Sequence, residues 1–124
     1  ISMKNLSKSY EDYIETIYCL EKKTGKVMSV DIARELNVSK PAVQKARDEL
    51  TSLGYIFKEP YGRISLTKDG KKVAEEIYDK HTSIKSFLLS LGIDEKTAEH
   101  DCCLIEHVIS DETLNKIKEF LKNK

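Results

Sequence analysis

Hydrophobic residues recur every three to four positions along most of this 124-residue chain, which is the spacing of one face of an α-helix. The pattern predicts a first helix over residues 7–24, stopped by Gly25. Two shorter helices follow, capped by Ser29 and Ser39, with a tight turn at residues 37–38 between them. The first half of the chain therefore contains a helix-turn-helix pattern.

A β-hairpin and three more helices are predicted after this pattern. Residues 55–58 and 63–66 are short strand-like segments on either side of a Pro-Tyr-Gly turn. Helical spacing then returns in segments that begin at Asp69, Asp94 and Asp111.

This order of elements predicts a mainly α protein with two parts. We expect an N-terminal winged helix-turn-helix over residues 3–72 and an all-helical domain over residues 73–124. The two short helices alone are also compatible with an αα-corner that has no role in binding DNA. The hairpin that follows them, with Lys58, Tyr61 and Arg63 near its tip, favours the winged helix.

Composition and charge give a mixed signal. The chain is 40% hydrophobic and 34% charged, and its 21 basic and 21 acidic residues cancel, which alone argues against nucleic-acid binding. However, residues 37–68 have six Lys or Arg against three Asp or Glu.

No segment approaches the roughly 20 apolar residues of a membrane span. Three cysteines, two of them adjacent, do not form a disulfide framework, so a cytoplasmic protein is expected.

The second helix of a helix-turn-helix enters the major groove by its N-terminal end, and a wing reaches the backbone. Gln can bind adenine and Lys can bind guanine, so polar residues at this helix end are candidates for base contacts. The expected DNA-binding residues are Ser39, Lys40, Pro41, Gln44, Lys45, Lys58 and Arg63.

The segment HDCCLIEH, residues 100–107, concentrates potential metal ligands. In a helix, Cys103, Glu106 and His107 share one face, with His100 one turn before them. A thiolate, a carboxylate and an imidazole can share a divalent ion, but one helix seldom completes a coordination sphere. The candidates for the remaining ligands are Asp12, Glu15 and His81. The alternative is a structural cluster in which the cysteines and His107 fill the core.

Five segments of the chain resemble the metal-dependent repressors of the diphtheria toxin repressor and manganese transport regulator family. They are YEDYIETIYCL, SVDIARELNVSKPAVQKARDELTSLGYI, LTKDGKKVA, KHTSIKSFL and HDCCLIEHVISDE, and they keep the order and spacing of the family. The resemblance implies a winged-helix DNA-binding domain, a helical dimerisation domain and a divalent metal as corepressor. It also implies the short form without an SH3-like domain, because the sequence ends at Lys124.

The resemblance implies a mixed set of metal ligands. Asp12 and Glu15 match ligands of the manganese-type proteins, whereas Cys103 and His100 match ligands of the iron type. The residues that match ligands of both types are His81, Glu106 and His107. A thiolate favours softer ions than Mn²⁺, so Fe²⁺ is the favoured corepressor and Mn²⁺ the second choice.

Lys85 departs from the iron-type pattern, which has a glutamate ligand at this position. An ammonium group offers no lone pair and repels a cation, so we expect an ancillary metal site that needs this position to be weak or absent.

The function expected from the sequence is that of a transcriptional repressor, not an enzyme, that binds double-stranded operator DNA as a homodimer and controls metal homeostasis genes. The dimer seam is expected on the apolar faces of the last two helices, at Ala98, Cys102, Ile105, Ile109, Leu114 and Ile117. Three alternatives remain open: a metal-independent winged-helix regulator, a metallohydrolase, and a redox switch through the adjacent cysteines, whose disulfide would be strained.

Overall fold

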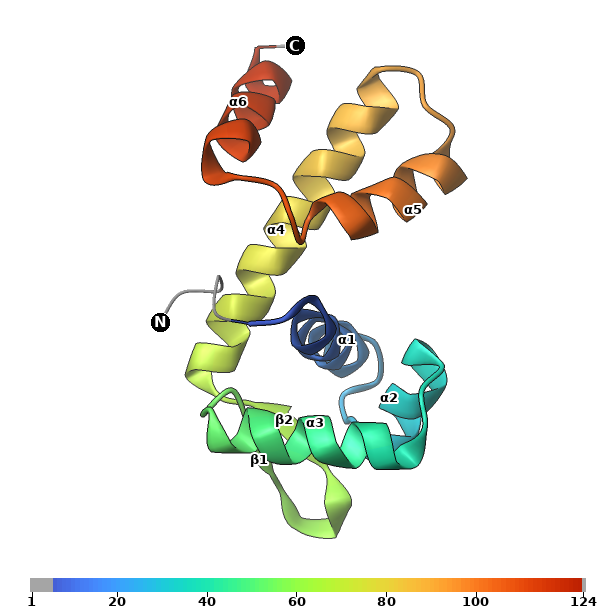
Figure 1. The fold of residues 1–124 in the computed structure, drawn as a ribbon, viewed down its shortest axis with the longest axis vertical. Helices are drawn as coiled ribbons and strands as arrows, with labels where there is room; N and C mark the ends of the chain where they lie inside the picture. Colours follow the sequence, from blue (N-terminus) through green and yellow to red (C-terminus); the bar gives the residue numbers. More distant parts are fainter. Residues whose placement is uncertain (1–5, 124) are drawn as a thin grey trace. The chain divides into compact units, whose positions relative to one another are not determined.

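The computed structural model describes residues 6–123. The chain forms two compact units, one ending at Glu75 and the other beginning at Glu76, and Figure 1 shows the elements of both. The division falls three residues after the boundary predicted from the sequence, inside a helix common to both units. Within residues 6–123, no helix is long and apolar enough to cross a membrane.

The N-terminal unit has the element order of a winged helix. It consists of α1 (Lys8–Thr24), α2 (Ser29–Leu36), α3 (Lys40–Ser52), β1 (Ile56–Lys58), the 3₁₀ turn η2 (Pro60–Gly62), β2 (Ile64–Leu66) and the first residues of α4 (Lys68–Ser90). The mainly α fold and the winged helix-turn-helix predicted from the sequence are therefore confirmed.

Local capping explains where these helices begin and end. The hydroxyls of Ser7 and Ser39 accept backbone N–H groups at 3.1 Å and 3.2 Å, and Gly25 ends α1 with a φ of 86°. The predicted cap at Ser29 is wrong, because α2 begins one residue earlier than a Ser29 cap requires. Met28 is the N-cap residue, and its backbone N–H donates to the Asp31 carboxylate at 3.0 Å.

The wing is a two-stranded antiparallel hairpin. β1 pairs with β2 in the register Ile56 to Leu66, and its inward side chains are buried in the core of the unit. At its tip, Tyr61 has a φ of 64° and is 94% exposed. Buried Ile56, Ile64 and Leu66 thus anchor the hairpin, while the tip stays in solvent.

The start of α4 packs closely against the backbone that precedes the hairpin. Thr67 donates its backbone N–H to the Tyr55 carbonyl at 3.0 Å, and its hydroxyl accepts the Gly70 N–H at 3.0 Å. Gly70 is buried, and a Cβ atom at this position would lie 1.9 Å from the same Tyr55 oxygen. Only a residue without a side chain fits this contact.

The C-terminal unit consists of the rest of α4, α5 (Glu95–Ile105) and α6 (Asp111–Lys122). The Asp94 carboxylate caps α5 and the Ser110 hydroxyl caps α6. A small apolar core of buried and partly buried side chains joins the three helices, and its members are Ile84, Cys102, Leu114, Leu88, Ile105 and Ile109.

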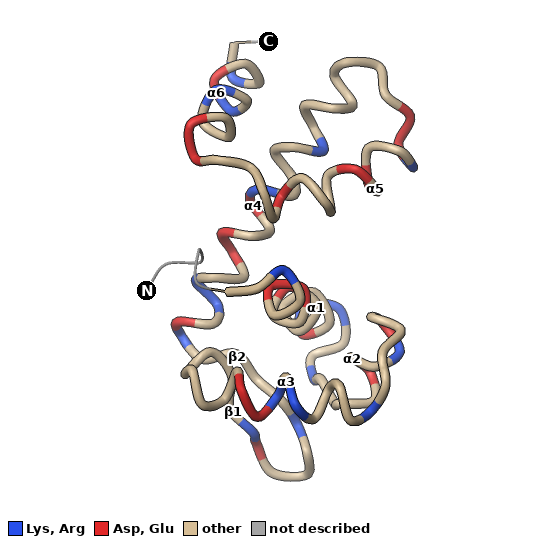
Figure 2. The backbone as a smooth tube through the Cα atoms, in the orientation of Figure 1, with Lys and Arg blue, Asp and Glu red and all other residues tan. Residues whose placement is uncertain are grey.

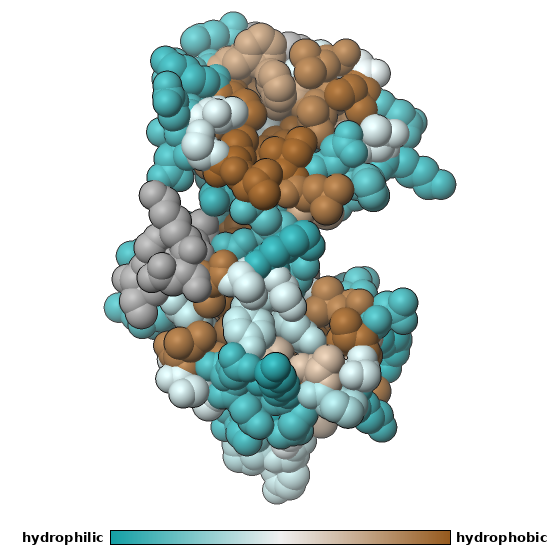
Figure 3. Space-filling model, in the orientation of Figure 1, coloured by the Kyte–Doolittle hydropathy of each residue, from teal (hydrophilic) through white to brown (hydrophobic). Residues whose placement is uncertain are grey.

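This core corrects the predicted dimer seam. Ala98 and Cys102 are fully buried and Leu114 is 7% exposed within a single chain, so these residues pack against their own helices. Large hydrophobic side chains that are exposed in this unit occupy other positions, namely Tyr78, Leu89, Leu91, Leu104, Val108 and Phe120. Figure 3 shows hydrophobic surface among the residues of α4, α5 and α6.

Candidate metal centre and DNA-binding surface

A buried carboxylate forms the centre of the candidate metal site in the C-terminal unit. Glu106 is 2% exposed, and its Oε1 lies 2.8 Å from Nδ1 of His81 on α4. Its Oε2 lies 3.5 Å from Nε2 of His107, whose side chain is only 3% exposed. Burial of a carboxylate is costly unless opposite charge or hydrogen bonds compensate for it, so this arrangement suits a group that receives a cation. Three predicted ligands are thus brought together.

The prediction that Cys103, Glu106 and His107 share one face of a helix is wrong in part. α5 ends at Ile105, so Cys103 lies on the helix while Glu106 is its C-cap and His107 belongs to the turn that follows. The Glu106 N–H still donates to the carbonyl four residues back at 3.0 Å, whereas the His107 N–H donates to the carbonyl three residues back at 3.4 Å. The i to i−3 bond of His107 is the tighter turn with which helices often end, and the capped start of α6 follows a few residues later.

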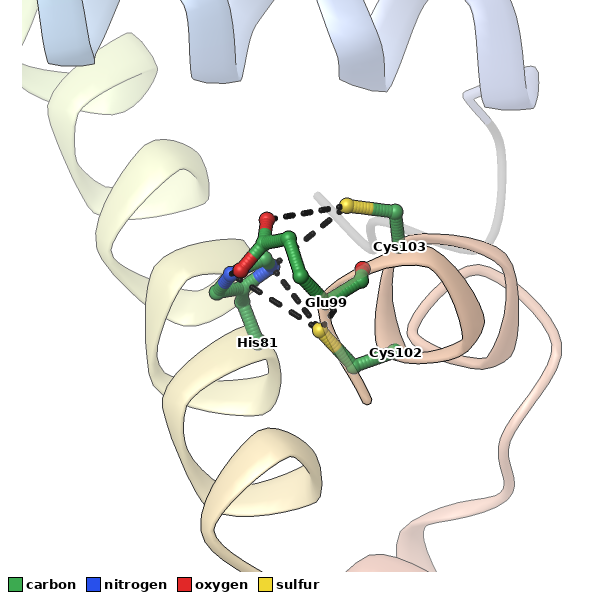
Figure 4. Close-up of side chains that lie close together, drawn as sticks. All are labelled: His81, Glu99, Cys102 and Cys103. Carbon is green, nitrogen blue, oxygen red and sulfur yellow. Dashed lines mark hydrogen bonds and ion pairs between the residues drawn. The ribbon is translucent and has the colours of Figure 1, made fainter. Parts of the chain in front are cut away.

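A second group of donors, from α5, surrounds the same histidine of α4, His81. The ligand atoms of His81, Glu99, Cys102 and Cys103 all lie within 4.8 Å of one another, and we call these four residues the thiol cluster. Figure 4 shows both sulfur atoms and the Glu99 carboxylate directed toward His81.

Glu99 and Cys102 were missed as candidate ligands in the sequence. Cys103 is the fourth residue after Glu99, so the helical spacing that grouped the other ligands was also a signal for Glu99. His100, the residue chosen instead, has a side chain that is 75% exposed, 3.3 Å from Asp101. The structure does not bring His100 to the cluster, and its role as a ligand stays a prediction.

The two remaining predicted ligands belong to the other unit. Asp12 and Glu15 lie on α1, and the Asp12 carboxylate is 3.0 Å from Nζ of Lys8. Their roles as ligands also stay predictions.

Lys85 modifies the charge of the thiol cluster. Its Nζ lies 3.0 Å from Oε1 of Glu99 and 3.7 Å from Glu95, and the hydrogen bond from Lys85 holds the pKa of Glu99 below its usual value. Burial and the nearby carboxylates raise the pKa of Cys102 to about 11. The Cys103 sulfur points inward although the residue is exposed, and desolvation and the hydrogen bond to Glu99 raise the pKa of that thiol too. Without a cation, both thiols are protonated at neutral pH.

The candidate DNA-binding surface consists of the start of α3 and the wing. The predicted residues Ser39, Lys40, Pro41, Gln44, Lys45, Lys58 and Arg63 are all exposed. Figure 2 shows both basic and acidic residues along this part of the backbone, so the surface is not uniformly basic.

Arg47 was not predicted for this surface, yet it organises the side chains there. Its guanidinium donates to the Gln44 amide oxygen at 2.8 Å and to the Ser29 hydroxyl at 3.3 Å. The Gln44 amide nitrogen donates to Asp48 at 3.4 Å. Gln44 is thus held in one orientation at the exposed side of α3.

The N-terminal unit is a winged helix-turn-helix, and the C-terminal unit clusters imidazole, carboxylate and thiol groups. Together these features define the class of winged-helix regulators with a metal-binding domain. Residues 5–64 match the family described as "Iron dependent repressor, N-terminal DNA binding domain". Residues 67–124 match "Iron dependent repressor, metal binding and dimerisation domain". The chain belongs to the diphtheria toxin repressor and manganese transport regulator family of metal-dependent transcriptional repressors.

Two relatives illustrate the similarity in sequence. An uncharacterized HTH-type transcriptional regulator of Methanocaldococcus jannaschii is 42% identical over 119 residues, which are 94% of this chain and 95% of the relative. The transcriptional regulator MntR of Salmonella typhimurium is 38% identical over 110 residues, which are 89% of this chain and 70% of the relative.

Solved structures show the same fold. T. acidophilum IdeR has a TM-score of 0.81 at 30% identity, over 90% of this chain and 53% of that one. The manganese regulator SloR has a TM-score of 0.81 at 29% identity, over 93% of this chain and 54% of that one. The chain spans about half the length of these solved structures.

Proposed function

We propose that this protein is a repressor that uses Fe²⁺ or Mn²⁺ as its corepressor, binds operator DNA as a homodimer and controls genes of metal homeostasis. The observation that supports the proposal is the buried Glu106 carboxylate, placed between His81 and His107 in the unit that matches a metal-binding and dimerisation domain.

The residues of the C-terminal unit that would hold the corepressor are His81, Cys103, Glu106 and His107. Imidazole nitrogen, carboxylate oxygen and one sulfur suit a divalent first-row transition metal. When bound, the ion would supply the positive charge that the buried carboxylate lacks. The chain's own side chains position the donors: His81 Nδ1 contacts Oε1 of Glu106 at 2.8 Å, and His107 Nε2 faces the other oxygen at 3.5 Å.

Regulation would follow from thermodynamic linkage. A metal that binds more tightly to the DNA-binding conformation increases the affinity for DNA, and DNA then increases the affinity for the metal by the same factor. Coupling of about 1–3 kcal/mol corresponds to about 5- to 150-fold in affinity. A homodimer would present two recognition helices to half-sites about 34 Å apart, one turn of the duplex.

The metal is proposed as Fe²⁺ first and Mn²⁺ second. The Cys103 sulfur favours the softer ion. Mn²⁺ retains support from similar proteins, because one is named a manganese regulator and another a manganese-activated repressor.

A metal titration monitored by operator binding tests the proposal. With the two ions compared under anaerobic conditions, we expect either ion to tighten operator binding and Fe²⁺ to act at the lower concentration. A chelator should reverse the effect. Operator binding that a chelator leaves unchanged would instead identify a metal-independent winged-helix regulator with a structural cluster.

Basic residues of α3 and the wing should determine the salt dependence of DNA binding. We expect Lys45→Ala and Arg63→Ala each to weaken operator binding and to reduce the slope of log K against log salt by about one unit, because each removes one phosphate contact. Metal affinity should not change. Lys116→Ala on α6 is the matched control, since Lys116 is exposed and its contact is with Glu119 at 3.7 Å. Parent-like salt slopes in both variants would contradict this DNA-binding surface.

A further inference from the structure

The thiol cluster combines donors that the proposed corepressor ligands do not include. Glu99 and Cys102 belong to it and have no part in the contacts around Glu106 and His107 described above. We propose that the thiol cluster is a binding site for a thiophilic divalent ion of the zinc class, held by two sulfurs, one nitrogen and one oxygen.

The distances between the donor atoms support this site. Zinc is bound tetrahedrally with Zn–S of about 2.3 Å and Zn–N or Zn–O of about 2.0–2.2 Å, which places neighbouring ligand atoms about 3.3–3.8 Å apart. The Cys102 sulfur lies 3.6 Å and 3.7 Å from the two ring nitrogens of His81, and the Cys103 sulfur lies 4.0 Å from Nδ1. The Cys103 sulfur is also 3.4 Å from Oε2 of Glu99, and Oε1 of Glu99 is 3.3 Å from His81 Nε2. One ion would use one ring nitrogen of His81 and one oxygen of Glu99. A ligand atom from each of the four residues lies within 4.8 Å of the others, so small side-chain movements would bring the donors to coordination distances.

Burial distinguishes this site from a surface cluster. Cys102 is fully buried and packs against the apolar core of the unit, while its sulfur contacts the imidazole of His81, whose side chain is 15% exposed. The site has its donors on two helices, α4 and α5, so the backbone already holds them together.

Lys85 completes the charge balance of such a site. Two thiolates and a carboxylate have three negative charges, and a divalent ion neutralises two of them. The Lys85 ammonium lies 3.0 Å from Oε1 of Glu99 and neutralises the third, while Oε2 faces the Cys103 sulfur. Lys85 thus acts as an outer partner that orients the Glu99 ligand, the role that second-layer groups have around zinc.

The chemistry of the donors selects the ion. Thiolate ligands favour zinc and similar soft ions over Mn²⁺, which prefers oxygen donors. Because the thiol cluster uses His81 and Cys103, an ion bound there would exclude a corepressor that needs the same two side chains. This last consequence rests on the proposed function, whereas the site itself does not.

X-ray absorption at the zinc edge tests the site without DNA. Metal-free protein is loaded with one equivalent of Zn²⁺, and the sulfur neighbours of the ion are counted. We expect two sulfurs at about 2.3 Å per zinc. One sulfur would show that zinc binds through Cys103 alone, as the proposed corepressor ligands require, and would overturn the thiol cluster while leaving the proposed function standing. A zinc ion with no sulfur neighbour would also overturn the thiol cluster.

Variants identify which sulfurs are counted. Cys102→Ser should reduce the count to one, and Cys19→Ser, which changes the exposed cysteine of α1, should leave it at two. A count of two in folded Cys102→Ser protein would overturn the proposal. If that variant fails to fold, Co²⁺ added to the Cys19→Ser protein gives a second measurement. Near-ultraviolet thiolate-to-cobalt absorption with the intensity of two thiolates supports the site, and the intensity of one or none overturns it.

Discussion

Glu106→Ala should abolish the stimulation of operator binding by metal, a loss of about 5- to 150-fold at saturating metal. The variant removes a carboxylate that is 2% exposed and that lies 2.8 Å from His81 and 3.5 Å from His107. Both imidazoles then lose the group that positions them for an ion. Metal titration followed by operator binding measures the effect.

Thermal unfolding provides an independent measurement of the same change. A ligand that binds only the folded state stabilises it by about 2.7 kcal/mol at a hundred times its Kd. We expect metal to raise the Tm of the parent and to leave that of Glu106→Ala unchanged. Glu119→Ala, at a side chain that is 63% exposed on α6, is the matched control and should respond like the parent. An equal response of parent and Glu106→Ala to metal would exclude Glu106 as a ligand.

Gly70→Ala should strongly destabilise the N-terminal unit. Alanine in a helix is normally about 0.5–1 kcal/mol more favourable than glycine, so helix propensity alone predicts stabilisation. Here the added Cβ would lie 1.9 Å from the Tyr55 carbonyl oxygen and 2.9 Å from its carbon, and both are backbone atoms. The backbone must shift, which we expect to cost about 1–3 kcal/mol or more.

Chemical or thermal unfolding of Gly70→Ala measures this cost, and each kcal/mol should lower the Tm by about 4–8 °C. The neighbouring Lys71→Ala is the control, because Lys71 is exposed and should change stability by less than about 0.5 kcal/mol. A Gly70→Ala protein at least as stable as the parent would show that α4 starts farther from Tyr55.

Much of the fold could be predicted because the signals are local. Ser39 and Asp94 cap their helices as the sequence indicates, and the hairpin forms around its Pro-Tyr-Gly turn. These features depend on residues within a few positions of each other. The cap at Ser29 was wrong because the Asp31 carboxylate accepts the Met28 N–H, which makes Met28 the N-cap of α2 instead.

The candidate site was less predictable because it depends on how helices pack. A shift of one residue turns a side chain by about 100° around a helix, so the choice between Glu99 and His100 needs the position of α4. The structure places Glu99 beside His81 and leaves His100 exposed.

The dimer seam was wrong in part for a related reason. The spacing of apolar residues shows which face of a helix is buried, but not whether the same chain or a partner buries it. Cys102 and Leu114 are buried by helices of their own chain.

The imidazole of His81 lies between two acids. Its Nδ1 is 2.8 Å from Glu106 and its Nε2 is 3.3 Å from Glu99. A neutral imidazole has one hydrogen to donate. When both acids are ionised, both contacts can therefore be hydrogen bonds at once only if each nitrogen has a proton. An ion that takes a lone pair from either nitrogen must expel that proton. Metal binding at a doubly protonated His81 would then exchange a proton for an ion, and acid would compete with the metal.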